Sequence, residues 1–111
     1  MLIRPAKEVK FIEQHLENQF LSLPENNYIK KGIQRAINDL KENAFCGEKI
    51  EKRLIPKEYI KKYAITNLWW YPLPDGWRLV YSIATNKSDI IAIIIEFFDH
   101  KDYARRFGYK S

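Results

Sequence analysis

The residues that could carry chemistry gather around one predicted turn. Segment 67–83, NLWWYPLPDGWRLVYSI, holds all three tryptophans of the chain, two tyrosines and a single arginine, Arg78. Aromatic rings stack on unpaired bases, and a guanidinium binds a phosphate through two parallel hydrogen bonds. Trp69, Tyr71 and Arg78 are therefore candidates for an RNA-binding surface. The same rings could also cover the sheet as core, with Arg78 held by a carboxylate.

A second group of candidates follows near the C-terminal end. His100 suits proton transfer because an unperturbed imidazole has a pKa of about 6.5, close to working pH. It could instead be structural, held by a hydrogen bond to Asp99. Tyr103 and Tyr109 could stack on a base or donate a proton, or pack in the core.

Basic side chains dominate the charge of the chain. Its 111 residues include 19 Lys and Arg against 14 Asp and Glu, which gives a net charge of +5 and favours an anionic partner. The excess lies in segments 49–63 and 99–111, on either side of the aromatic turn in the sequence. The candidate RNA contacts in these segments are Lys57, Lys61, Lys62, Arg105 and Arg106. Each of them could also be ordinary solvated surface.

Other classes of protein are disfavoured by what the sequence lacks. No Cys and His cluster has metal-ligand spacing and no glycine-rich nucleotide loop is present, so we expect neither a metal nor a cofactor. The single Cys46 predicts a reduced thiol. No leader is visible, and the longest apolar run, 90–95, is far shorter than the roughly 20 residues of a membrane span. We therefore expect a cytoplasmic protein without a membrane segment. His15 lies among polar residues, which predicts a solvated side chain.

Hydrophobic periodicity predicts an α+β fold. Apolar residues at three- and four-residue spacing predict amphipathic helices over 6–22 and about 26–43, which would form an N-terminal helical hairpin. Pro56 predicts the start of a short helical turn. Aromatic and β-branched runs over 67–73 and 77–84 flank Pro74-Asp75-Gly76 and predict a β-hairpin. A turn at 86–89 precedes an apolar strand over 90–98, and a short helix is expected over 99–107.

The faces of the hairpin follow from the turn that is assumed. A two-residue Asp75-Gly76 turn would pair Leu73 with Arg78. The face predicted to pack on the helices then carries Leu68, Trp70, Pro72, Trp77, Leu79, Tyr81 and Ile83. The open face would carry Trp69, Tyr71, Leu73, Arg78, Val80 and Ser82. On that face Arg78 could ion-pair with Asp75 or Glu96, or bind phosphate.

The order of these elements and the segment Gly76–Tyr81, GWRLVY, resemble the RelE/ParE-type toxin superfamily. Its members are small basic toxins of toxin–antitoxin pairs, with two N-terminal helices on a small curved antiparallel sheet. They share a Gly-Tyr/Trp-Arg-aliphatic-aliphatic-Tyr core. Here His100, Lys101 and Tyr103 resemble the basic His-Arg and later Tyr that close many members. The likeness covers most of the chain and implies one toxin domain over residues 1–111.

The resemblance also implies roles for particular residues. In the RNA-cleaving branch the arginine of the core, here Arg78, stabilises the scissile phosphate. The C-terminal His-Lys pair and the tyrosine after it become further catalytic candidates. Two lysines on the preceding strand often complete the family's site, and their places fall at Trp69 and Tyr71. Aromatic rings therefore replace that lysine cluster.

Two functions remain open from the sequence. The leading hypothesis is a toxin that acts as a metal-independent endoribonuclease on mRNA positioned by the ribosome. The alternative is a relative without catalysis, either a poison of DNA gyrase or an inactive homologue that retains antitoxin binding. The aromatic replacements favour the alternative, and both hypotheses imply a cognate antitoxin that wraps the helices and covers the basic site.

Overall fold

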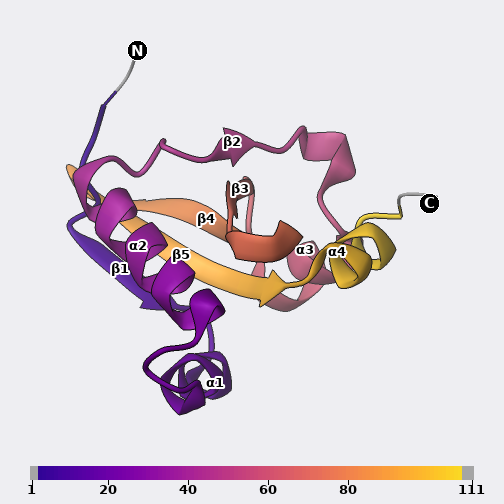
Figure 1. The fold of residues 1–111 in the computed structure, drawn as a ribbon. Helices are drawn as coiled ribbons and strands as arrows, with labels where there is room; N and C mark the ends of the chain where they lie inside the picture. The colour runs from indigo at the N-terminus through magenta and orange to yellow at the C-terminus, as the bar shows by residue number, and fades with distance from the viewer. Residues whose placement is uncertain (1–2, 109–111) are drawn as a thin grey trace.

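The computed structural model of the chain describes residues 3–108 and confirms the α+β class (Figure 1). Its elements are β1 (Glu8–Phe11), α1 (Gln14–Ser22), α2 (Tyr28–Glu42), β2 (Glu48–Lys49), the 3₁₀ turn η1 (Lys52–Leu54), α3 (Lys57–Tyr63), β3 (Trp69–Pro72), the 3₁₀ turn η2 (Pro74–Gly76), β4 (Arg78–Asn86), β5 (Asp89–Phe98) and α4 (His100–Arg106). Five strands form one sheet in the order β1-β5-β4-β3-β2. The sheet is mixed, because β1 runs parallel to β5 while the other neighbours are antiparallel. The prediction of a wholly antiparallel sheet is therefore wrong.

The first predicted helix is wrong over its N-terminal part. Residues 8–11 form β1, in which exposed and half-buried side chains alternate as in an edge strand. The helix α1 begins only at Gln14, and its buried residues are Leu16 and Phe20. A helix would have satisfied the backbone of residues 8–11 internally, but β5 offers them a parallel partner 83 residues away in the sequence, since Glu8 pairs with Ile91. Local periodicity does not contain that partner.

The later elements agree with the predictions to within a few residues. Helix α2 begins after Asn27, whose side-chain oxygen accepts hydrogen bonds from the backbone N–H groups of Ile29 at 2.8 Å and Lys30 at 3.0 Å. The helix predicted after Pro56 is α3, and the one predicted over 99–107 is α4. Asp99 caps α4 by accepting a hydrogen bond from the backbone N–H of Asp102 at 2.8 Å.

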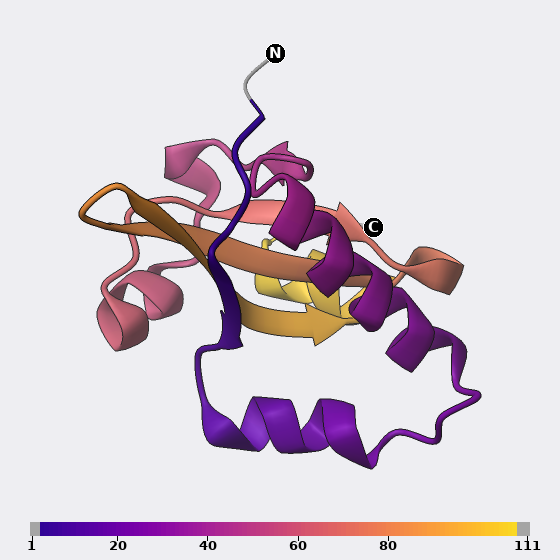
Figure 2. The same ribbon diagram turned by 90° about the vertical axis from the view of Figure 1, so that its left-hand side faces the viewer.

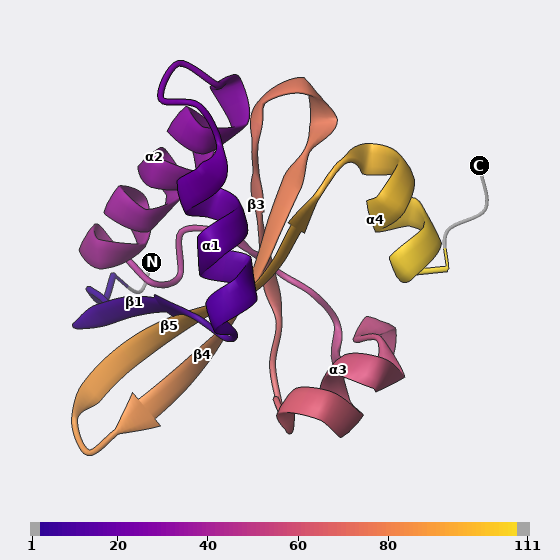
Figure 3. The ribbon, with the colours of Figure 1, turned by 90° about the horizontal axis from the view of Figure 1, so that it is seen from below.

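The sheet separates two hydrophobic clusters. Helix α2 covers one face and α3 and α4 the other, while α1 lies along the edge formed by β1 and β5 and adds Leu16 and Phe20 to the first cluster, as the views in Figures 2 and 3 show together. The first cluster includes Leu16, Phe20, Ile33, Ala36, Leu40, Leu79, Tyr81, Ala92 and Ile94. The second includes Tyr59, Leu68, Val80, Ile95, Phe98 and Tyr103. Along β5 buried residues alternate with half-buried ones, and Ile95 and Phe98 are buried in the second cluster, so the strand contacts both clusters and its near-continuous apolar sequence is explained.

The turn between β3 and β4 is longer than the two-residue turn predicted. The N–H of Leu73 donates to the carbonyl of Trp77 at 2.8 Å, so η2 forms a three-residue loop. Asp75 and Gly76 both have positive φ, of 57° and 76°, and Gly76 adopts this conformation without strain. As a result Pro72 rather than Leu73 lies opposite Arg78. The predicted pairing is wrong by one residue, which exchanges the two faces of β3.

Candidate functional site

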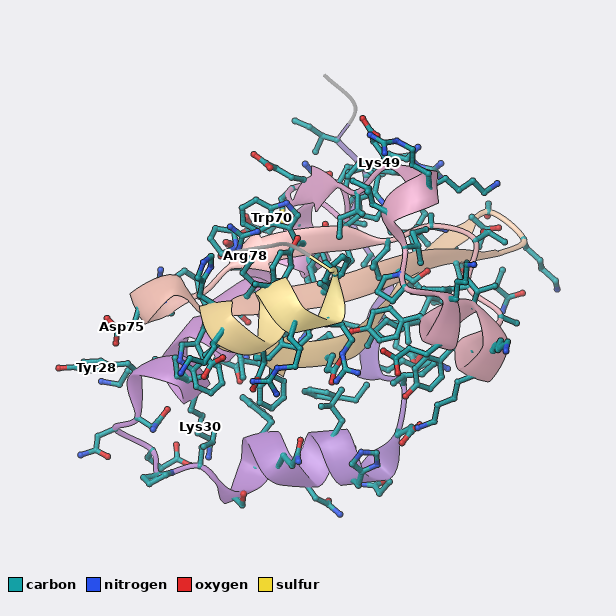
Figure 4. All side chains as sticks on the ribbon, turned by 90° about the vertical axis from the view of Figure 1, so that its right-hand side faces the viewer. Tyr28, Lys30, Lys49, Trp70, Asp75 and Arg78 are labelled. Carbon is teal, nitrogen blue, oxygen red and sulfur yellow. The ribbon has the colours of Figure 1, made fainter. Side chains whose placement is uncertain are left out.

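Arg78, the first residue of β4, lies between two aromatic rings. Its guanidinium carbon is 4.1 Å from the centroid of the Trp70 ring and 4.3 Å from that of the Tyr103 ring. Both distances are typical of cation–π contacts. Figure 4 shows Arg78 and Trp70 close together on the sheet face across which α4 runs. We call these three residues, Trp70, Arg78 and Tyr103, the arginine clamp.

Among residues 3–108 no carboxylate neutralises the guanidinium of the clamp. Within residues 3–108 it forms no hydrogen bond or ion pair, and its contacts are the two rings. Glu96, which the sequence offered as a partner, is bound instead by Tyr59 and Arg106. A half-buried cation fixed by rings keeps its N–H donors for an external anion. This is the geometry of a site for one phosphate or carboxylate.

The two rings predicted to lie beside Arg78 lie on the opposite face of the sheet. Trp69 contacts Phe45 edge to face, with ring centroids 5.3 Å apart, and Tyr81 at 6.3 Å. The hydroxyl of Tyr71 donates to Asp39 Oδ2 of α2 at 2.5 Å. Burial and this hydrogen bond raise the pKa of Tyr71. The one-residue change in register puts Trp69 and Tyr71 on the face that packs against α2, so they do not form a stacking platform with Arg78.

Trp70 takes the place that the sequence assigned to those rings. Its neighbour across the strands is Val80, so its side chain shares a face with Arg78. Sequence reasoning missed it because Trp69, Trp70 and Tyr71 are adjacent aromatic residues, and only the length of the loop decides which of them faces Arg78. The missed signal was Pro74, which takes part in a three-residue loop.

His100 and Lys101 lie at the end of the sheet where the clamp forms. Phe98, opposite Arg78 in the β4–β5 pairing, precedes His100 by two residues. A Cβ placed on Gly76 would lie 3.6 Å from the Cβ of His100, so the imidazole residue adjoins η2. His100 and Lys101 are exposed at the start of α4. Asp99 caps that helix, and within residues 3–108 no hydrogen bond holds the imidazole.

Tyr103 belongs to the core instead of the solvent-facing site. The residue is 2% exposed, and its ring packs on Phe98 at 5.7 Å and stacks on Phe107 at 4.5 Å. A ring enclosed in this way supports Arg78 from below and has no face left for a nucleotide base. Of the roles predicted for Tyr103, packing in the core is confirmed and base stacking is wrong, while proton donation by its hydroxyl stays a prediction. Tyr109 lies outside the described residues.

The cations predicted to bind phosphate differ in whether they form ion pairs within the protein. Lys61 and Arg105 are exposed, and Arg105 pairs with Asp102 at 3.5 Å. Lys62 is exposed and pairs with Glu13 at 3.1 Å. Arg106 is a structural cation, which corrects the prediction of a phosphate contact or a solvated surface. It donates to Glu58 at 2.8 Å and to Glu96 at 3.0 Å.

The contacts of Arg106 hold α4 in position. Glu96 of β5 accepts hydrogen bonds from Arg106 and from the hydroxyl of Tyr59 of α3. Burial and the Glu96 hydrogen bond raise the pKa of Tyr59, and the hydrogen bond to Glu58 raises the pKa of Arg106. This network joins α3, α4 and β5. It therefore fixes the helix that carries His100, Lys101 and the Tyr103 ring of the clamp.

Two further features are absent from residues 3–108. No group of three His, Cys, Asp or Glu side chains is arranged to hold a metal ion. No helix among these residues has the length and apolar character of a membrane span. His15 is solvated, with its side chain 67% exposed and its Nδ1 2.8 Å from Glu13. Comparisons with protein-family models, curated proteins and solved structures find no significant match.

Proposed function

We propose that this protein is a toxin of the RelE/ParE type that binds mRNA on the ribosome and cleaves it without a metal. The observation that carries the proposal is the arginine clamp. Arg78 stands in the GWRLVY segment, is fixed between two rings and keeps its donors for an anion. The α1 and α2 layer on the sheet is consistent with the resemblance seen in the sequence. The lack of a carboxylate partner for Arg78 in the described part of the chain, residues 3–108, favours binding of phosphate over a structural ion pair.

The chemistry assigned to the clamp is stabilisation of charge. In cleavage, the 2′-oxygen of RNA forms a bond to phosphorus and the bond from phosphorus to the 5′-oxygen breaks. The 2′-hydroxyl gives up a proton, the leaving 5′-oxygen takes one, and the phosphorane carries additional negative charge. Arg78 can place two N–H donors on its non-bridging oxygens, where fixed donors contribute most. The rings restrict the guanidinium, so little order is lost when the transition state forms.

His100 is proposed to transfer one of the two protons, and solvent the other. It is exposed at the start of α4, beside η2 and at the same end of the sheet as Arg78. Lys101 adds a second positive charge there. Trp70 is proposed to keep Arg78 in place and to border the base next to the scissile phosphate. Lys61, Lys62 and Arg105 would add affinity through more distant phosphates.

The test compares variants in growth arrest and in single-turnover cleavage of ribosome-bound mRNA, at the Mg²⁺ concentration that assembled ribosomes require. Arg78→Ala should abolish arrest and lower the cleavage rate by roughly 10²–10³, the usual loss for one charge-stabilising donor. Arg78→Lys should rescue little because an ammonium cannot form the fork. The matched control is Arg35→Ala, which removes an exposed cation from α2 on the other side of the sheet. Undiminished toxicity of folded Arg78→Ala would overturn the assignment.

His100 is tested in the same assay. His100→Gln should lower the rate by roughly 10²–10⁴ with little change in RNA binding, and the pH profile of the wild-type rate should be lost in this variant. A His100→Gln enzyme with the wild-type rate and pH profile would contradict proton transfer by this residue.

A second function is favoured by one observation. β3 contributes no lysine to the clamp, and the His100 imidazole has no hydrogen-bonding partner within residues 3–108 that would orient it. A relative without catalysis needs neither a lysine at the clamp nor an oriented imidazole. Such a relative would be either a gyrase poison or an inactive homologue that binds its antitoxin. Trapping of cleaved DNA complexes with purified gyrase, with ribosome-bound mRNA left intact, would favour the gyrase poison. Antitoxin binding with neither activity would favour the inactive homologue.

The proposal also implies a cellular location and binding partners for the protein. Both functions require a cytoplasmic protein with a cognate antitoxin, and the leading one requires the ribosome as a partner. An antitoxin of this kind would neutralise the toxin by covering the clamp or the basic surface around it. Co-expression of a candidate antitoxin should restore growth in cells that make the wild-type chain.

A further inference from the structure

One edge of the sheet is only half covered. β1 pairs with Ile91–Ile94 of β5, and beyond it the N–H of Ile12 donates to the carbonyl of Ile94 at 2.8 Å. The chain then turns away into α1. β5 continues to Phe98, so its last four residues have β4 on one side and, within residues 3–108, no strand on the other. An unpaired edge of this kind is a template for another extended chain.

The backbone of Phe97 faces this open edge. Along β5 the carbonyls of Ile90 and Ile94 point away from β4, because they accept hydrogen bonds from Lys7 and Ile12. The irregularity between Val80 and Tyr81 adds one residue to β5 and shifts the alternation by one. Phe97 therefore takes the next outward position, and its N–H and C=O can pair with a further strand.

A cleft of about 340 Å³ runs along this half-edge. Ile95 to Phe98 form one wall, and the others come from α1, α3 and α4, including Leu16, Gln19 and Tyr63. Figure 4 shows α1 lying along the sheet below α4, and Figure 2 shows the same helix from the other side. The open edge is therefore accessible from a cleft and is not sealed by the core.

The charge of the cleft is opposite to that of the whole chain. The chain has a net charge of +5, but the cleft is lined by Glu13, Glu58, Glu96 and Asp102 against Lys62 and Arg106. The side chains of Glu58 and Asp102 are 59% and 51% exposed, with Glu58 paired to Arg106 at 2.8 Å and Asp102 to Arg105 at 3.5 Å. The excess of carboxylates favours a basic occupant and disfavours a second copy joined edge to edge, which would bring two such sets of carboxylates together.

We propose that this half-edge binds an extended segment of a partner protein that carries a lysine or arginine. The segment adds a strand beside residues 95–98, pairs with the backbone of Phe97, and places its basic side chain near Glu58 and Asp102. This surface is distinct from the arginine clamp, because Asp102 and Arg106 line the cleft while Tyr103 of the same helix contacts Arg78. The proposal does not depend on RNA cleavage.

The test selects peptides from a random eight-residue library displayed on phage, with the whole folded chain as the target. The enriched peptides should share alternating apolar positions and one lysine or arginine. A synthetic, labelled copy of the best peptide is then titrated by fluorescence anisotropy. On binding, the Phe97 amide should become protected from hydrogen exchange, which simple electrostatic adsorption would not produce.

Matched variants separate the backbone from the charge. Phe97→Pro removes the outward N–H, and Phe97→Ala removes the ring but keeps the N–H. The Phe97→Pro protein should bind the peptide roughly 3- to 10-fold more weakly than the Phe97→Ala protein, which is the effect of one lost hydrogen bond. The double variant E58K/D102K reverses the charge of two exposed carboxylates and should weaken binding on the order of tenfold, whether or not the proline variant folds. Because Glu58 also pairs with Arg106 at 2.8 Å, urea unfolding must first show that this variant is folded.

Several results would overturn the proposal. These are the failure of any peptide family to enrich, enriched peptides without a basic residue, and peptide binding that E58K/D102K leaves unchanged. An unprotected Phe97 amide in the complex would also refute it. Sedimentation of the free chain as a dimer that Phe97→Pro dissociates would assign the edge to a second copy instead.

Discussion

The stacking of Trp70 on Arg78 can be measured as a coupling free energy. The perturbations are Trp70→Leu, which keeps an apolar side chain without a π system, and Arg78→Met, which keeps an unbranched stem without the charge. The guanidinium carbon is 4.1 Å from the Trp70 centroid and 4.3 Å from that of Tyr103. A cation–π contact contributes about 0.5–1 kcal/mol when exposed and about 2 when desolvated. Because Arg78 is half-buried, we expect about 1 kcal/mol for the Trp70 contact.

The assay is urea unfolding of the wild type, the two single variants and the double variant at pH 7. Each single variant also changes packing, and the double-mutant cycle subtracts those separate effects. Arg78→Met removes the contact with Tyr103 both in the wild type and in the Trp70→Leu background. The free energy of that contact therefore cancels from the coupling. The expected result is a double variant that is about 1 kcal/mol more stable than the sum of the single losses predicts.

A matched cycle with Trp69→Leu provides the control. Trp69 packs on Phe45 and Tyr81 on the other face of the sheet, so its loss and the loss of the Arg78 charge should add to within about 0.3–0.5 kcal/mol. Coupling to Trp69 with none to Trp70 would refute the register of β3 and restore the pairing expected from a two-residue turn. No coupling to either ring would refute the arginine clamp.

Three further predictions concern stability. Tyr81→Phe should lower the free energy of unfolding by about 1–3 kcal/mol, measured by thermal unfolding. The Tyr81 hydroxyl donates to the carbonyl of Ala44 at 2.9 Å and accepts from the N–H of Gly47 at 3.0 Å, and the variant leaves both backbone groups without this partner. Gly47→Ala should cost about 1–3 kcal/mol in urea, since the new Cβ would lie 2.6 Å from the Trp70 carbonyl oxygen; an unchanged midpoint would contradict this packing. Hydrogen bonds from Tyr63 and then Lys62 lower the pKa of Glu13 below its ordinary 4.5. The Glu13 carboxylate therefore stabilises the fold above that pH and stabilises it less as the pH falls through the lower, folded pKa, so Glu13→Gln should flatten the loss of stability between about pH 5 and about pH 3. Parallel pH profiles of the two proteins would exclude this role.

The elements predicted best are those whose signals are local. The spacing of apolar residues over α2 and the unbroken apolar run of β5 each depend on residues close in sequence. The α+β class followed from them. The placement of Arg78 away from the α2 side of the sheet also followed, because residues alternate along β4 whatever strand lies beside it.

The prediction of the site failed where a distant contact or a loop length was needed. Trp69 and Tyr71 were expected beside Arg78, and Trp70 is there instead, because one additional loop residue at η2 exchanges the faces of a strand. Arg106 was expected to meet phosphate or solvent, but Glu58 and Glu96 reach it from α3 and β5. Such ion pairs join elements that the sequence does not relate to one another.

By itself, the sequence determined the helical and extended character of most segments, the excess of positive charge and the one arginine of the aromatic segment. Only the tertiary structure decided that residues 8–11 form a strand, that Trp70 and Tyr103 enclose Arg78, and that the last part of β5 faces an acidic cleft. The physical reason is the range of the interactions. Periodicity and capping act over one or two helical turns, whereas strand pairing and ring stacking join residues whose distance in sequence carries no information about their distance in space.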